Sequence, residues 1–196
     1  MSPLRQWRSP LAVIAFALMA AGVGLAAHPV AHAIIGQVSA AQAKAMWKKW
    51  KQSHAENSGK ASAEPGQPAF WLRVPSCKIS VLVLRESDAE ALHRFPAVRQ
   101  LDSGGCVVLA HRDTHFHGLA DVRVGDEIRV ETADGSRAPY VVRSIRILLP
   151  EQVSAALDDP ETRNSLHLLT CYPFTYFGAA PKRFLVTAAA GGVQPR

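Results

Sequence analysis

From residue 69 onward the chain is a succession of short β-rich runs divided by turn-forming residues, and this alternation limits the folds it can adopt. Phe70–Val74 and Ile79–Leu84 are two such runs, split by a proline. Glu127–Thr132 and Tyr140–Leu148 alternate like the arms of a hairpin across Ala133–Ser136. Many short strands with turns between them predict a β-barrel or a β-sandwich, and periodicity alone does not choose between the two.

Short helices are expected in the connections. Ser87–Glu90 has the pattern of a capping box, in which a serine hydroxyl and a glutamate carboxylate satisfy free amides at a helix start. Gly118–Val124 has room for one helical turn, and Pro150–Leu157 is expected to form a short helix. A further strand, Cys106–Ala110, follows the turn at residues 102–105.

One strand ends in a thiol. Ser165–Thr170 is an apolar run of the length of one buried strand, and it leads directly into Cys171. Tyr172-Pro173 then prevents the strand from continuing, because proline has no N–H for a ladder. A single cysteine at such a place is, on position alone, as readily explained as a buried structural residue.

Two other stretches favour chemistry at this thiol. Val107–Phe116 is an apolar strand that runs into His111, and Ala180–Val186 carries Arg183 into another strand. A thiol, an imidazole and a guanidinium at three strand edges are the components of a cysteine transferase.

These motifs resemble the sortase family of cysteine transpeptidases, and most closely the class D-like sortases of Gram-negative bacteria. The resemblance rests on Ala-His-Arg-Asp-Thr-His-Phe at 110–116, Leu-Leu-Thr-Cys at 168–171 and the later Arg183, in the family's order, and it covers about residues 70–189. It implies an all-β fold with short helices, an eight-stranded β-barrel preceded by an N-terminal transmembrane helix.

The resemblance assigns a role to each motif residue. Cys171 is the nucleophile, and His111 holds or moves the proton, because a thiol with an ordinary pKa of about 8.5 needs help to ionise. Arg183 cannot act as a base, since guanidinium stays protonated, but it can donate hydrogen bonds to an oxyanion. Thr170 and Tyr172 are expected to bind substrate, although an aromatic residue at 172 is equally expected in the core.

The implied reaction is cleavage of a substrate protein at a C-terminal Leu-Pro-x-Thr-Gly-like sorting signal, between Thr and Gly. A thioester with Cys171 would then be resolved by a primary amine acceptor. No cofactor is implied. The two residues after His111, Arg112 and Asp113, are expected to pair with each other, to cap a turn or to shape the loop.

Two rival functions remain open. His111, His115 and His117, with Asp113 between them, could bind zinc and serve a metal-dependent hydrolase. Alternatively, the barrel could belong to a membrane-anchored binding protein without catalysis. A disulfide between Cys77 and Cys106 would leave Cys171 free, and both cysteines are equally explained as small buried side chains.

The net charge of +6 is located in one part of the chain. Residues 1–60 hold seven Lys or Arg and one acid, whereas residues 61–196 hold fifteen of each sign. The globular part is therefore neutral and lacks the excess of basic residues that a nucleic-acid reader carries. Attraction to a membrane surface explains the basic excess better.

The N-terminal region predicts a membrane anchor. Leu11–Ala27 contains no charge and follows Arg5 and Arg8, which favours an uncleaved signal anchor over cleavage near Ala31-His32-Ala33. We therefore expect a single-pass protein of the inner membrane with its catalytic domain on the periplasmic, extracytoplasmic side. The expected parts are an anchor at 1–35, a basic helix and flexible linker at 36–68, and a catalytic domain at 69–196.

Residues 37–52 predict a helix with one apolar face. Ala43, Met46, Trp47 and Trp50 recur at helical spacing, and the lysines fall mostly on the other face. The tryptophans suit a membrane interface, or the helix packs on the domain. Ser53–Gln67 lacks periodicity and predicts a tether.

Overall fold

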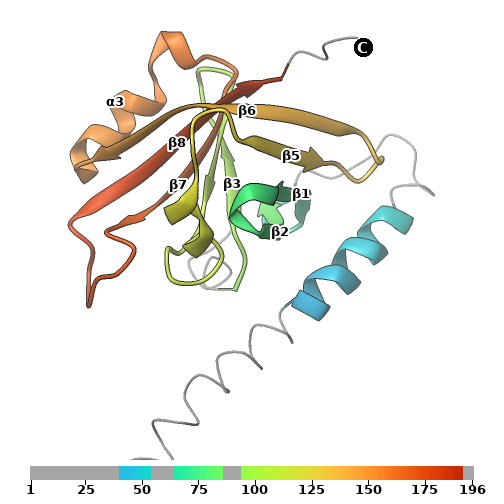
Figure 1. Ribbon diagram of the computed structural model, residues 1–196. Coiled ribbons are helices and arrows are strands. Elements are labelled where there is room, and N and C mark those ends of the chain that lie inside the picture. The colour runs from blue at the N-terminus through green and yellow to red at the C-terminus, as the bar shows by residue number, and fades with distance from the viewer. Residues whose placement is uncertain (1–39, 54–63, 86–93, 192–196) are drawn as a thin grey trace, which may run out of the picture. The chain divides into compact units, whose positions relative to one another are not determined.

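The computed structural model of the chain describes residues 40–53, 64–85 and 94–191. Among them, eight strands close into a barrel in the order β1-β2-β3-β4-β7-β8-β6-β5 (Figure 1). The barrel is the architecture adopted, and not the sandwich. The strands are β1 (Pro68–Val74), β2 (Ile79–Arg85), β3 (Ala97–Gln100), β4 (Cys106–Leu109), β5 (Glu127–Glu131), β6 (Arg137–Leu148), β7 (Leu166–Tyr172) and β8 (Lys182–Ala190).

The helices in the connections are short, as the sequence predicts. They are η1 (Pro75–Cys77), η2 (His117–Asp121), η3 (Pro150–Gln152), α3 (Val153–Leu157) and η4 (Pro160–Thr162). The turn expected at 118–124 is present with shifted bounds, and the helix expected at 150–157 is present as η3 followed directly by α3. The capping box at Ser87–Glu90 lies outside the described residues.

Two parallel pairings join segments that are distant in sequence. β4 pairs with β7 in parallel, and β2 pairs with β3 in the same way, whereas the other neighbouring strands are antiparallel. As a result, β7 lies between β4 and β8. The barrel thus brings the segments around residues 110, 171 and 183 to neighbouring strands.

Alternation along the strands separates an interior from an outer face. Leu166 and Leu168 of β7 belong to the main apolar cluster, as do Phe184 and Val186 of β8. The intervening positions face the other way, because successive side chains of a strand point to opposite sides. Val107, Leu169 and Leu185 therefore form a second cluster on the outside, covered by Ala156 and Leu157 of α3.

A third apolar cluster lies on the outer face of β1 and β2. Trp71 of β1 and Leu82 and Leu84 of β2 pack against Ala43 and Trp47 of the helical residues 40–53. The rings of Trp47 and Trp71 are 6.1 Å apart, and Trp47 is 8% exposed. This burial supports the second of the two interpretations of the helix, packing on the domain, and Ala43–Arg196 form one compact unit.

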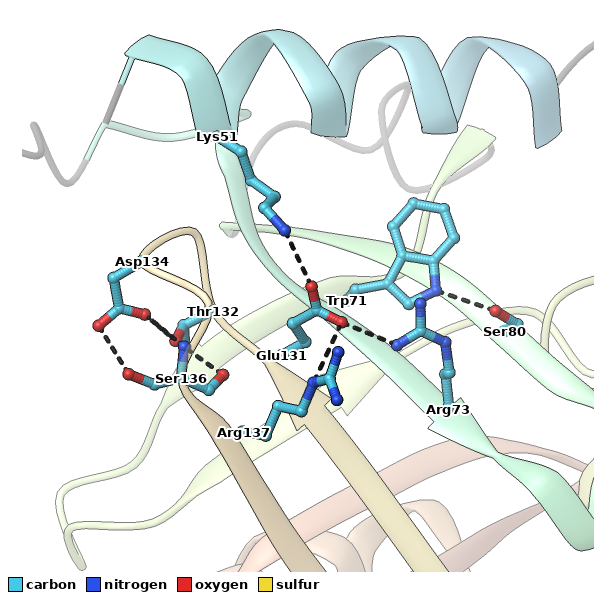
Figure 2. Close-up of polar contacts among 9 residues, drawn as sticks. All are labelled: Lys51, Trp71, Arg73, Ser80, Glu131, Thr132, Asp134, Ser136 and Arg137. Atoms are coloured by element: carbon cyan, nitrogen blue, oxygen red, sulfur yellow. Dashed lines mark hydrogen bonds and ion pairs between the residues drawn. The ribbon is translucent and has the colours of Figure 1, made fainter. Parts of the chain in front are cut away.

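A buried carboxylate completes this contact. Glu131 of β5 accepts hydrogen bonds from Lys51 at 3.1 Å and from Arg73 at 3.0 Å, and the Arg137 guanidinium lies 3.9 Å away (Figure 2). The hydrogen bond from Arg73 is the main cause that lowers the pKa of Glu131, with Lys51 adding to it, although burial acts in the opposite direction. Lys51 thus ties the helix to β5.

The predicted anchor, Leu11–Ala27, lies outside the described residues. Within the residues that are described, no helix combines the length and apolarity needed to cross a bilayer. The division into parts at 1–35, 36–68 and 69–196 stays a prediction.

Candidate active site

Cys171 and Arg183 are direct neighbours across two strands. In the antiparallel register of β7 and β8, Cys171 is paired with Arg183. Residues paired in this way project on the same face of the sheet with their Cβ atoms about 4.5–5.5 Å apart. Both residues are partly buried, so the thiol and the guanidinium share one accessible patch on the outside of the barrel.

His111 follows the end of β4 on the other side of β7. The parallel register pairs Leu109 with Leu169, and it continues through a hydrogen bond from the Ala110 amide to the Leu169 carbonyl at 3.3 Å. Two residues beyond Leu109, the chain therefore brings His111 level with Cys171. Like Cys171, His111 is partly buried.

Cys171 and Arg183 are thus cross-strand neighbours, and His111 follows β4 two residues after Leu109, whose partner Leu169 lies two residues before Cys171. Two residues away on the same face, the neighbouring positions of the three strands are all leucine. They pack in the outer cluster beside α3 and are Leu109, Leu169 and Leu185. These packed leucines fix the strand ends, because tightly packed side chains leave the backbone little freedom to shift. The functional groups are therefore placed by the rigid part of the fold.

The Arg183 guanidinium is held by its own loop. Its Nη1 donates to the carbonyls of Ala180 at 3.1 Å and of Lys182 at 2.9 Å. Within the described residues, Nη2 and Nε have no such contact, so donors remain for a substrate oxygen. This is the arrangement that stabilisation of an oxyanion needs.

Comparisons with known proteins agree with this geometry. A family model of the sortase domain matches residues 72–190. Sortase D of Bacillus subtilis (strain 168) is 29% identical over 137 residues, which are 67% of this chain and 68% of that protein.

The chain belongs to the sortase family.

As a sortase, the protein is a cysteine transpeptidase. Among solved structures, the catalytic domain of B. anthracis SrtD is 26% identical with a TM-score of 0.53, covering 70% of this chain and 97% of that one. Sortase A from Corynebacterium diphtheriae is 20% identical with a TM-score of 0.55, covering 79% and 86%, and shows the fold alone. These relatives do not support the narrower placement among sortases of Gram-negative bacteria.

The two residues predicted to bind substrate have structural contacts. Thr170 is 3% exposed and its hydroxyl donates to the Ala110 carbonyl at 2.7 Å, which joins β7 to the end of β4. Tyr172 stacks on Phe184 with ring centroids 6.1 Å apart and meets Phe174 edge-on. By alternation both face away from the side that carries Cys171, so their substrate-binding roles stay predictions.

Arg112 makes contacts that the sequence did not predict. It donates through Nη2 to the carbonyls of Tyr176 at 2.9 Å and of Gly178 at 3.1 Å, and does not pair with Asp113. Tyr176 and Gly178 belong to the β7–β8 loop, residues 173–181. Of the three roles expected for Arg112, pairing with Asp113, capping a turn or shaping the loop, these contacts agree with the last, although the sequence did not indicate which loop it would contact.

The histidines near the site do not form a metal centre. The described part of the chain contains no group of three His, Cys, Asp or Glu side chains placed to hold an ion. The ring of His115 contacts the Arg94 carbonyl at 2.9 Å. Burial is the main cause that lowers the pKa of His115; the hydrogen bond to the Arg94 carbonyl opposes it, and a smaller electrostatic effect of His111 adds to the lowering. Among the described residues, His111, His115, His117 and Asp113 are therefore not arranged as a ligand set.

The other cysteines are free thiols, and the disulfide considered from the sequence is not formed. Cys77 is buried in η1, and Cys106 begins β4. Burial is the main cause that raises the pKa of both thiols. A raised pKa keeps a thiol protonated and poorly nucleophilic, so neither competes with Cys171 for the catalytic role.

Proposed function

We propose that Cys171, His111 and Arg183 are the catalytic residues and that the enzyme cleaves C-terminal sorting signals of the Leu-Pro-x-Thr-Gly type. The observation that carries the proposal is the register across β4, β7 and β8, in which Cys171 is paired with Arg183 and His111 follows the end of β4. The register supports a common face for Cys171 and Arg183, and the direct continuation of β4 into His111 supports its place beside them. Chance placement of a nucleophile, a proton carrier and an oxyanion donor at neighbouring strand ends is a poor alternative.

Each residue has one part in the reaction. His111 takes the proton of the Cys171 thiol, the sulfur attacks the Thr carbonyl, and Arg183 donates hydrogen bonds to the oxygen that gains charge. His111 gives a proton to the leaving amine as the Thr–Gly bond breaks, which leaves a thioester. A primary amine of the acceptor then attacks the thioester, loses its proton to His111 and releases the sulfur, so that a new amide bond forms.

The β7–β8 loop, which runs between Cys171 and Arg183, offers exposed aromatic side chains to an extended peptide. Tyr176 and Phe177 of this loop are 48% and 103% exposed. Thr170 and Tyr172 are proposed to contribute to substrate binding by fixing the strand end that carries the sulfur. The partners of the enzyme are accordingly a substrate protein with a sorting signal and an amine acceptor.

The proposed setting is extracytoplasmic. Leu11–Ala27 would anchor the chain in the inner membrane as a single span, with the linker up to residue 68 and the catalytic domain on the periplasmic side. The assignment to Gram-negative bacteria belongs to this proposal and rests on the three motifs alone.

Cleavage assays on the full-length chain test the proposal. Internally quenched Leu-Pro-x-Thr-Gly peptides with varied x should be cleaved, and Cys171→Ala should abolish cleavage because no other group can form the thioester. His111→Ala should lower kcat roughly 10²–10⁴-fold, the usual contribution of proton transfer. Cys106→Ala is the matched control and should keep its activity.

Mass spectrometry should detect an acyl adduct on Cys171 when the acceptor amine is withheld. Circular dichroism should show that all variants keep the native fold. A fully active Cys171→Ala enzyme would end the proposal.

A further inference from the structure

The β7–β8 loop connects the nucleophile to the guanidinium and has little packing of its own. Phe174 is held at one end by the ring of Phe184, 5.0 Å away. After it, residues 175–179 are all exposed, and no buried side chain fixes them. Within the described residues, the hydrogen bonds that tie 175–179 to another element are the two from Arg112.

Arg112 is itself firmly placed. Ala110, two residues before it, makes two hydrogen bonds to β7: its amide donates to the Leu169 carbonyl, and its carbonyl accepts from the Thr170 hydroxyl. The chain is closed again by a hydrogen bond from the Phe116 amide to the His111 carbonyl at 3.1 Å, and Phe116 is fully buried. The backbone on both sides of Arg112 is therefore part of the rigid domain.

The contact geometry suits a guanidinium and no other cation. One nitrogen reaches two carbonyls separated by one residue, and the carbon of the guanidinium lies 6.0 Å from the Tyr176 ring centroid. Arginine can combine a planar stacking contact with directed hydrogen bonds. Lysine offers a compact charge that cannot stack in this way.

The far end of the same loop holds Arg183. Its Nη1 donates to the carbonyl of Ala180 in the loop and to that of Lys182, the first residue of β8. A loop that moves at residues 176–178 also moves the Ala180 carbonyl. The orientation of the Arg183 guanidinium therefore depends on where the loop is held.

We propose that Arg112 is a positioning residue: it clamps the β7–β8 loop to the His111 segment and thereby orients the Arg183 guanidinium over Cys171. This role rests on the proposed function of Arg183. Arg112 does not touch the reacting atoms. Removal of the Arg112 side chain releases the loop. His111 and Cys171 then keep their positions, whereas the Arg183 guanidinium loses its orientation.

Kinetics of the full-length enzyme test the clamp against a merely structural role. Arg112→Ala should lower kcat about tenfold with KM changed less than about threefold, because the lost alignment acts in the transition state. Arg112→Lys should not restore kcat, whereas millimolar guanidinium chloride added to Arg112→Ala should restore part of it. Arg143→Ala, which removes an exposed arginine of β6, is the matched control and should behave like the wild type.

A double-mutant cycle tests whether the effect passes through Arg183. In an Arg183→Lys background, Arg112→Ala should lower kcat by less than about twofold, since the group it positions is already lost. Additive losses, or an unchanged kcat in the single variant, would refute the proposal.

Hydrogen exchange separates this proposal from the proposed function, because it needs no substrate. Amides of residues 174–180 should exchange faster in Arg112→Ala than in the wild type, while those of β7 and β8 keep their protection. Unchanged exchange in the loop would overturn the clamp. Failure of the wild type to cleave any sorting-signal peptide would instead count against the proposed function and leave the exchange result standing.

Discussion

Two outer faces of the barrel both carry charged side chains, which are paired within the protein on one face and left partly exposed on the other. On the outer face of β1, β2 and β5, here the docked face, Glu131 is surrounded by Lys51, Arg73 and Arg137 (Figure 2). The apolar side chains of this face pack against Ala43 and Trp47 of the helix. On the outer face of β4, β7 and β8, here the site face, Cys171 and Arg183 remain partly exposed. β1 and β7 are opposite in the barrel, since the same number of strands lies between them in either direction.

The difference shows how a charge is used for stability or for chemistry. The Glu131 carboxylate has two hydrogen bonds and a third nearby cation, so its charge is satisfied within the protein. Among the described residues, the Arg183 guanidinium donates to the protein through Nη1 alone, which leaves Nη2 and Nε as donors for a substrate oxygen. A group left partly unsatisfied on a rigid strand is typical of a site that binds a transition state.

The largest expected effect sharpens this contrast on the site face. Arg183→Lys should lower kcat roughly 10²–10³-fold, the usual cost of losing one oxyanion donor, because lysine cannot present several directed donors. The thermal midpoint should change little, since the side chain is partly exposed and bonded only to its own loop. Steady-state peptide cleavage and thermal unfolding measure the two quantities. A large loss of stability with unchanged kcat would reverse the assignment of the two faces.

The docked face should respond in the opposite sense. Trp47→Ala should lower the free energy of unfolding by roughly 2 kcal/mol, less than for a core tryptophan because the helix can leave the barrel instead of enclosing a cavity. kcat should stay within about twofold of the wild type, since the site is on the other side of the barrel. Urea unfolding and peptide cleavage are the measurements, with Lys49→Ala on the exposed side of the helix as the control. If Trp47→Ala unfolds like the wild type, the helix does not belong to the folded domain.

The sequence predicted the strands better than it predicted how the strands pair. Runs such as Ile79–Leu84 and the Glu127–Thr132 hairpin arm matched β2 and β5 to within a residue, because alternation and turn residues are local signals. Closure into a barrel is decided by pairings between distant segments, such as β4 with β7, and local periodicity carries no record of them. It was the family resemblance that anticipated the barrel.

The site shows the same limit. Cys171, His111 and Arg183 could be named from motifs, since each is the chemically distinctive residue of its strand end. The contacts of Arg112 could not be predicted, because they depend on a loop conformation that brings the carbonyls of Tyr176 and Gly178 within reach. Likewise, helical spacing left two partners for Trp47, and only the position of Trp71 on the outer side of β1 distinguishes them.

The smallest expected effect separates the two faces by pH. On the site face, His167 is fully buried with Nδ1 3.1 Å from the Thr187 hydroxyl, and burial lowers its pKa from the ordinary value of 6.5. The unfolded chain therefore binds the proton more tightly, so the contribution of neutral His167 is present above pH 6.5 and is lost as the pH falls through the folded value. On the docked face, the lowered pKa of Glu131 has the same sign in a more acidic window, below its ordinary value of 4.5.

Two variants should therefore flatten different parts of one stability curve. His167→Gln keeps a polar group near Thr187 and should reduce the loss of stability between about pH 7.5 and 5, leaving a remainder to His115, whose pKa is also lowered. Glu131→Gln should leave that range unchanged and weaken the pH dependence below about 4.5. Urea midpoints measured across the range decide the matter. If the urea midpoints of His167→Gln and the wild type change equally with pH above pH 5, burial of His167 does not couple folding to protonation. The two faces would then not differ in their response to acid.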